Sequence, residues 1–250
     1  MDESNIQRKS LPVENSCSLI TKLNNSVCTN TSSYEETSPE NCSVDHEADL
    51  KNSREGRGGE ELSAELSVAL QRCLLGGKSG SGAGIDLSSL VVVEGKICWD
   101  LYINGLVVSS DGNLLDALGT AIKAALSNTG IPKVNVAAGA SGDEQPEVDV
   151  SDEEFLQFDT SRVPVIVTLT KVGRHYIVEA TSEEESQMCL AVSISINRQG
   201  RICGLTERGG AGLDPSIILD MISVAKTVSE QLINTLDSHI AAAEAGEEES

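Results

Sequence analysis

The clearest pattern of apolar and polar positions predicts a strand followed directly by a helix in the middle of the chain. Apolar and polar residues alternate between Ile97 and Val108, which indicates a strand with one buried face. From Leu114 to Leu126 apolar residues recur at intervals of three and four, which is typical of an amphipathic helix. The helix is expected to stop at a polar, glycine- and proline-containing segment. That segment contains Asn128, Gly130 and Pro132.

A polar turn joins this strand to this helix. Its side chains could accept the unpaired backbone N–H groups of the helix N-terminus. Free N–H groups and the helix dipole favour an anion at such a place, so the turn is where chemistry is first expected. The turn consists of Ser109, Ser110, Asp111, Gly112 and Asn113.

The same patterns predict the other elements of an α+β domain. A helix is expected from Gly59 to Leu75, and a last helix begins at Pro215 after Asp214 as N-cap. The apolar stripe of the last helix continues to Ile240 and should pack on a sheet. Alternation within residues 188–196 indicates a strand covered on one face. Strands are expected at residues 87–93, paired as a hairpin with the strand at 97–108, and at 163–172, 175–180, 188–196 and 201–205.

Three segments are expected to lie outside this domain or on its surface. Residues 1–54 are rich in Ser, Asn, Thr and Glu and should be disordered, either as a solvated tail, as a regulatory tail, or as an atypical replacement of earlier strands. The acidic stretch up to Glu154 suggests a surface excursion with a short strand. Residues 246–250 form an acidic tail, so the folded domain is placed at residues 55–245.

Charge and cysteine content narrow the function classes. With 39 acidic and 18 basic residues among 250, the net charge is −21, which repels nucleic acid unless a local basic patch or a partner supplies the contact. The seven cysteines form no Cys-x-x-Cys spacing and are expected to be reduced thiols, with Cys73 and Cys98 in the core. The sequence contains no apolar segment long enough to predict export or a membrane span.

Common catalytic and cofactor motifs are absent from the sequence. The three histidines are scattered, no Gly-x-Ser-x-Gly elbow occurs, and no glycine fingerprint follows a strand. These observations argue against a serine hydrolase, a zinc enzyme and a dinucleotide-binding protein, and no metal or cofactor is expected. The histidines are His46, His175 and His239.

The polar turn resembles a signature of the RNase PH domains, which are phosphate-dependent 3′-to-5′ ribonucleases and their inactive relatives in the exosome ring. Active members carry Asp-Gly-Gly-Thr-Arg, whose hydroxyl and guanidinium hold the attacking phosphate. This chain has Asp111 and Gly112 followed by Asn113, Leu114 and Leu115. Leucines can form neither the hydrogen bond nor the bidentate clamp, so the phosphate site is expected to be lost.

A second family signature is a pair of aspartates six residues apart that binds a metal ion and assists proton transfer. Glu179 and Glu185 stand at these places, and each side chain is one methylene longer. The longer side chains would displace the two carboxylates by about 1 Å from the positions that aspartates occupy, and a displacement of this size can lower the rate roughly 100-fold. A solvated acidic turn is the alternative interpretation. Two further runs resemble the family, one at residues 55–77 and one at residues 198–216.

The resemblance implies a non-catalytic, RNase PH-like (ribosomal protein S5 domain 2-like) subunit of the RNA exosome ring, with its N-terminal strands missing. Implied partners are other RNase PH-like subunits, S1/KH cap subunits, and RNA passing through the ring; implied compartments are the cytoplasm and the nucleus with its nucleolus. An active phosphorolytic exoribonuclease and a truncated chain that does not assemble remain alternatives. Candidate RNA contacts are Arg57, Arg174 and Arg208, each of which could equally be a solvated surface arginine.

Overall fold

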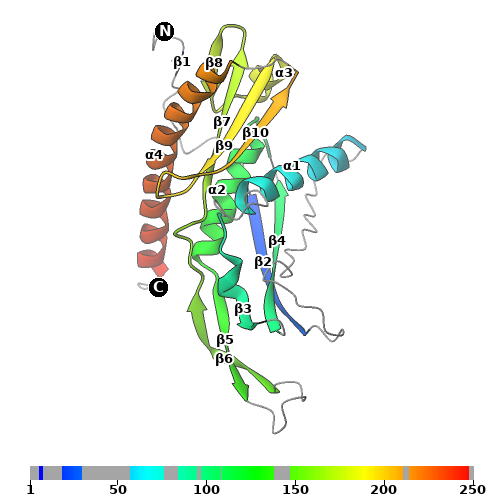
Figure 1. The fold of residues 1–250 in the computed structure, drawn as a ribbon, viewed down its shortest axis with the longest axis vertical. Helices are drawn as coiled ribbons and strands as arrows, with labels where there is room; N and C mark the ends of the chain where they lie inside the picture. The colour runs from blue at the N-terminus through cyan, green and yellow to red at the C-terminus, as the bar shows by residue number, and fades with distance from the viewer. Residues whose placement is uncertain are drawn as a thin grey trace.

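The computed structural model has the α+β architecture that the sequence predicts. The residues that it describes are 6–7, 19–29, 57–75, 84–94, 97–107, 109–137, 147–210 and 214–247. Figure 1 shows one elongated molecule in which helices cover a central sheet and a narrow pair of strands extends from one end. The predicted tail at 246–250 lies largely outside the described residues.

The central sheet has five strands in the order β1-β8-β7-β9-β10. Strands β8, β7, β9 and β10 are joined antiparallel to their neighbours, whereas the two-residue β1 runs parallel to β8. The predicted strands in this half of the chain are therefore confirmed, with ends shifted by a few residues. The bounds are β1 Ile6–Gln7, β7 Val165–Val172, β8 His175–Val178, β9 Leu190–Ile196 and β10 Ile202–Gly209.

Both faces of this sheet are covered, which corrects the expectation of one covered face. All seven residues of β9 are buried. Its Val192 and Ile194 belong to a core with helix α4 (Pro215–Glu247), which lies along one face. Helices α1 (Arg57–Leu75) and α2 (Leu114–Ser127) lie on the other face. The alternation of apolar and polar residues in β9 was misleading because the face toward α1 and α2 buries small polar residues, which a sequence pattern assigns to the solvent.

A second sheet has the order β2-β4-β3, and it corrects two sequence predictions. Strand β2 (Leu19–Thr29) pairs antiparallel with all of β4 (Ile97–Val107), inside the segment predicted to be disordered. Eleven ladder positions can order a polar segment whose composition alone would not. The rest of 1–54, apart from β1, lies outside the described residues. The predicted strand at 87–93 is a 3₁₀ turn, Leu87–Leu90, followed by the short strand β3, Val91–Val93.

Strands β5 (Gly130–Ala137) and β6 (Glu147–Gln157) form a separate two-stranded sheet, which we call the β5–β6 arm. Figure 1 shows it extending from the end of the molecule away from α3. The sequence predicted only a surface excursion with a short strand here. Strand β6 is 11 residues long, and its length was not apparent from the sequence because an exposed two-stranded sheet needs few apolar residues and tolerates many acidic ones.

Helix α2 carries a buried lysine that fixes the loop before β7. The Lys123 ammonium donates to the backbone oxygens of Thr160 at 3.1 Å and Val163 at 2.7 Å. Burial lowers the pKa of Lys123 to about 8, and the nearby Arg198 guanidinium acts in the same direction. Four cysteines of the described residues are free thiols; Cys73 is fully buried and Cys98 half-buried. No helix in the described part of the chain is long and apolar enough to cross a membrane.

Candidate functional site

The two segments singled out by their sequence lie against each other. The Ser182 backbone N–H donates to the Asp111 carbonyl at 2.6 Å, and the Ser182 hydroxyl donates to the Asp111 carboxylate at 3.0 Å. Gly112 has φ +105° and lies so close to residues 180–182 that a Cβ would stand 2.6 Å from the Ala180 carbonyl oxygen. The turn before α2 therefore fits only with glycine at position 112, and it is joined to the turn before helix α3, Ser182–Ser186.

Helix α2 begins with a backbone N–H bound to a carboxylate from another element. Asn113 is the N-cap with φ 49°, and its side chain makes no capping hydrogen bond to the helix. This corrects the expectation that turn side chains satisfy the helix N-terminus. The Asn113 N–H donates instead to Glu185 Oε1 at 3.2 Å. A carboxylate fixed at a helix N-terminus interacts favourably with the free N–H groups and the helix dipole, as a bound anion would.

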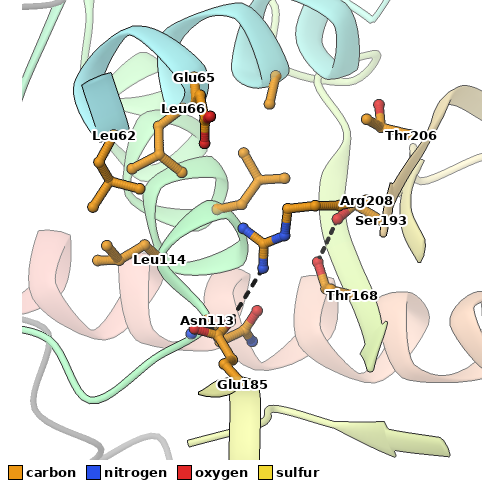
Figure 2. A pocket seen from close by; sticks show the side chains of 12 residues that line it. Leu62, Glu65, Leu66, Asn113, Leu114, Thr168, Glu185, Ser193, Thr206 and Arg208 are labelled. Carbon is orange, nitrogen blue, oxygen red and sulfur yellow. Dashed lines mark hydrogen bonds and ion pairs between the residues drawn. The ribbon is translucent and has the colours of Figure 1, made fainter. Parts of the chain in front are cut away.

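A cavity of about 170 Å³ opens between α1, α2 and β10 beside this contact. Figure 2 shows Leu62, Leu66 and Leu114 along one side of it and Thr168, Ser193 and Thr206 along the other. Leu114 and Leu115, predicted to replace the phosphate clamp, both line it. The complete lining is Leu62, Glu65, Leu66, Ala69, Asn113, Leu114, Leu115, Thr168, Glu185, Ser193, Thr206 and Arg208.

Arg208 extends from β10 across this cavity toward Glu185 (Figure 2). Its guanidinium nitrogen lies 3.6 Å from Glu185 Oε1, so the same carboxylate oxygen faces both the helix N-terminus and the arginine. Of the three predicted RNA contacts, only Arg208 has a described side chain at this site. Arg174 is exposed on the turn between β7 and β8, and Arg57 is the first residue of α1, with a side chain outside the described residues.

The sequence analysis missed Asp116, a buried carboxylate in the first turn of α2. Its two oxygens accept from the Thr168 N–H at 2.6 Å and from the Thr168 hydroxyl at 2.5 Å. The Thr168 hydroxyl is 2.8 Å from that of Ser193, and both hydroxyls line the cavity. Burial, with a smaller contribution from the negative charge of Glu179, raises the pKa of Asp116 to about 7, although the hydrogen bonds from Thr168 and Asn113 act in the opposite direction. The signal in the sequence was an acidic residue within the apolar stripe of the helix.

Glu179 and Glu185, the predicted carboxylate pair, have different surroundings. Glu179 follows β8 with φ 58°, an unusual conformation for a residue other than glycine, and acts electrostatically on Asp116. Glu185 is on α3 at the cavity, where its side chain is 26% exposed. Within the described ranges no group of three or more His, Cys, Asp or Glu residues could hold a metal ion. Glu185 is therefore a half-buried carboxylate that faces the N-terminus of α2 and Arg208.

Replacing Glu185 with alanine should lower the free energy of unfolding by about 1 kcal/mol, because a hydrogen bond to a charged acceptor at the α2 N-terminus is lost. Urea unfolding followed by circular dichroism measures the change. Glu183→Ala is the matched control, since Glu183 is an exposed residue of the same short helix. Equal effects of the two substitutions would show that the Asn113–Glu185 contact contributes nothing.

Comparison with known proteins identifies two family matches. Residues 15–132 match the model described as 3′ exoribonuclease family, domain 1, and residues 162–228 match domain 2 of the same family. The first match starts at residue 15 and includes β2, although the sequence analysis placed the start of the resemblance near residue 55. Both polar turns and the cavity lie within the matched segments.

Similar curated proteins come from eukaryotes and archaea. The chain is 38% identical over 152 residues to a putative exosome complex exonuclease RRP42 of Dictyostelium discoideum, covering 61% of this chain and 47% of the relative. It is 31% identical over 178 residues to the exosome complex component Rrp42 of Methanothermobacter thermautotrophicus, covering 71% and 61%. The chain thus spans between about half and three fifths of the length of these relatives.

Solved structures agree with the fold. A chain of an archaeal exosome core superposes with a TM-score of 0.62 at 22% identity, covering 89% of this chain and 78% of that one. A chain of an Archaeoglobus fulgidus exosome, solved with RNA bound to the active site, gives a TM-score of 0.60 at the same identity. At this identity the likeness establishes the architecture of the sheet and helices.

Proposed function

Since the chain belongs to the 3′ exoribonuclease family of RNase PH domains, we propose that it is a non-catalytic, structural subunit of an RNA exosome core ring. In this role it supports 3′-to-5′ RNA processing and degradation, including ribosomal RNA maturation and mRNA decay, by completing the ring. The names of its relatives support the assembly, since one is an exosome complex component and the other a putative exosome complex exonuclease. The proposed partners are the other RNase PH-like ring subunits, the S1/KH cap subunits and RNA threaded through the ring, in the cytoplasm and the nucleus with its nucleolus.

The observation that supports a non-catalytic role is the position of Glu185. Its carboxylate accepts from the α2 N-terminus at 3.2 Å and faces Arg208 at 3.6 Å, the two groups best suited to hold an incoming phosphate. A phosphate ion would have to displace this carboxylate, against the repulsion of like charges and the loss of both contacts. The side chains of Leu114 and Leu115 add apolar surface and no hydrogen-bond donor beside it. The Glu185 carboxylate of the chain thus occupies the place where a phosphorolytic enzyme binds inorganic phosphate.

Co-expression with the other ring subunits tests the structural role. The chain should appear in one large particle by native mass spectrometry, and a preparation that lacks it should yield smaller species. The particle should release no nucleoside diphosphate from RNA at this subunit when inorganic phosphate is supplied. A chain that stays alone or aggregates would support the alternative of a truncated product that does not assemble.

A phosphorolytic exoribonuclease is the second candidate, and one observation favours it. Asp116 lies within electrostatic reach of Glu179, and it is joined through the Thr168 and Ser193 hydroxyls to the cavity. A carboxyl group with a pKa near 7 is suited to proton transfer. A phosphorolytic exoribonuclease of this kind should release nucleoside diphosphate in the presence of phosphate with the wild-type chain, and the release should disappear in Asp116→Asn.

A further inference from the structure

The β5–β6 arm exposes large apolar side chains on strand β6, which also carries several acidic residues. Phe155 is 58% exposed and Leu156 is 59% exposed. The chain has two phenylalanines, and the other, Phe158, is 3% exposed in the core. Two adjacent large apolar residues at this exposure are more than the scattered single residues normal for a surface.

The arm holds these side chains in a fixed position on the molecule. At its base Ile131 is buried in the main core, and Val134 and Val150 pack against the same core. Phe155 pairs with Pro132 across the two strands, and its side chain lies close to Gly130. Because successive residues of a strand point to opposite faces, Phe155 and Leu156 project from the two sides of a sheet that is only two strands wide.

The charges beside these residues restrict the partner. Asp149, Glu153 and Glu154 are exposed on the same strand. The Lys133 ammonium, on the facing strand, is 2.7 Å from the Glu154 carboxylate and is thereby neutralised. A surface of this charge repels the phosphates of nucleic acid and attracts lysine and arginine side chains. The partner surface is therefore that of a basic protein region.

The backbone of β6 argues against a partner that adds a strand. The Ser151 hydroxyl accepts from the backbone N–H groups of Glu153 at 3.3 Å and Glu154 at 3.0 Å. The pairing register of the arm also shifts between Pro132 and Val134. An interrupted strand with occupied N–H groups is a poor template for a further strand. Recognition must come from side chains.

We propose that the base of the β5–β6 arm, where Phe155 and Leu156 lie, is a docking element that fits into a cleft of a neighbouring protein subunit. The cleft has apolar walls that cover Phe155 on one face and Leu156 on the other, and its rim carries lysine or arginine residues opposite Glu153 and Asp149. Buried aromatic anchors surrounded by a charged rim are the usual composition of such contacts. The inference rests on the proposed function, because the neighbour is another subunit of the ring.

A photo-reactive benzoylphenylalanine at position 155, in the full chain co-expressed with the ring subunits, identifies the occupant. Irradiation of the purified particle should cross-link position 155 to a protein segment that contains apolar residues flanked by Lys or Arg, as read by peptide mass spectrometry. Cross-links to RNA, or none above those from position 219, would overturn the proposal. Leu219 is the matched control position because it is an apolar side chain that is 66% exposed and lies on another element, helix α4.

Substitutions measure the contribution of the arm to assembly. Phe155→Ser with Leu156→Ser should reduce incorporation into the particle about tenfold or more, and Glu153→Lys should reduce it most at low salt. Leu219→Ser and Glu230→Lys, both on exposed positions of α4, are the controls. Circular dichroism checks that each variant stays folded. If the arm variants enter the ring as well as wild type does, the docking proposal fails and the proposed function stands. If wild type itself does not enter the ring, the proposed function fails, and the docking proposal fails with it.

Discussion

Gly112→Ala should lower the free energy of unfolding by about 3–5 kcal/mol and separate the two turns of the site. Gly112 has φ +105°, where any other residue is strained. The added Cβ would also lie 2.6 Å from the Ala180 carbonyl oxygen and 2.6 Å from the Ser182 nitrogen, which are backbone atoms that cannot rotate away. The hydrogen bonds between Asp111 and Ser182 would be lost with the close approach. Urea unfolding followed by circular dichroism measures the effect.

Gly173→Ala is the control for strain without a clash. Gly173 has φ +61°, and no atom lies within 4 Å of the Cβ that would be added. Its cost should be about 1 kcal/mol, the usual penalty for a left-handed conformation. If both substitutions cost the same, the contact between the two turns is not what makes glycine necessary at position 112.

Asp116→Asn should remove a large pH dependence of stability. The ordinary carboxyl pKa is 3.8, and burial raises that of Asp116 to about 7. Between these two values the folded chain holds the proton more tightly than the unfolded chain, so wild type is more stable at pH 4 and loses stability as the pH rises to 7. The full difference approaches about 4 kcal/mol. Asparagine can keep both contacts to Thr168, accepting from its N–H and donating to its hydroxyl.

Thermal or urea unfolding at pH 4, 5.5, 7 and 8 tests this. The stability of Asp116→Asn relative to wild type should increase steadily up to pH 7 and stay level above it. Asp220→Asn, an exposed position on α4, should leave the pH profile of wild type unchanged. A wild-type profile parallel to that of Asp116→Asn would mean that Asp116 is ionised throughout this range.

The fold was predictable where one strong periodicity dominates a segment. The apolar stripes of α1, α2 and α4 and the strands β4, β7 and β9 correspond to predicted elements. The family resemblance, which rests on the polar turn and on the runs at residues 55–77 and 198–216, is confirmed by the two family matches. Strand β2 was missed because it is ordered by pairing with β4, a long-range contact that composition does not encode. Strand β6 was predicted only as a short strand, because its many acidic residues are compatible with a sheet that stays in solvent.

Some residues of the site could be singled out from the sequence, but their arrangement could not. The sequence placed Asn113, Leu114, Leu115 and Glu185 in two signatures, and the cavity brings these four together. That Glu185 binds the α2 N-terminus depends on the approach of α3 to the turn before α2, which spacing alone does not give. Asp116 was missed because one acidic residue on an apolar stripe usually reads as surface. Its role follows only from burial against Thr168, 52 positions away.

The chemical reactivity of the buried Lys123 can report how often helix α2 separates from residues 160–163. With 4% of its surface exposed and its ammonium held by two carbonyl groups, the amine is shielded from acylating reagents as long as α2 and residues 160–163 stay together. Lysines such as Lys226 on the outer surface of α4 are exposed and should react at once. The rate at which Lys123 becomes acetylated therefore measures the free energy of separating this loop from the helix. Applied to the free chain and to an assembled particle, the same amine would show how much assembly tightens the fold.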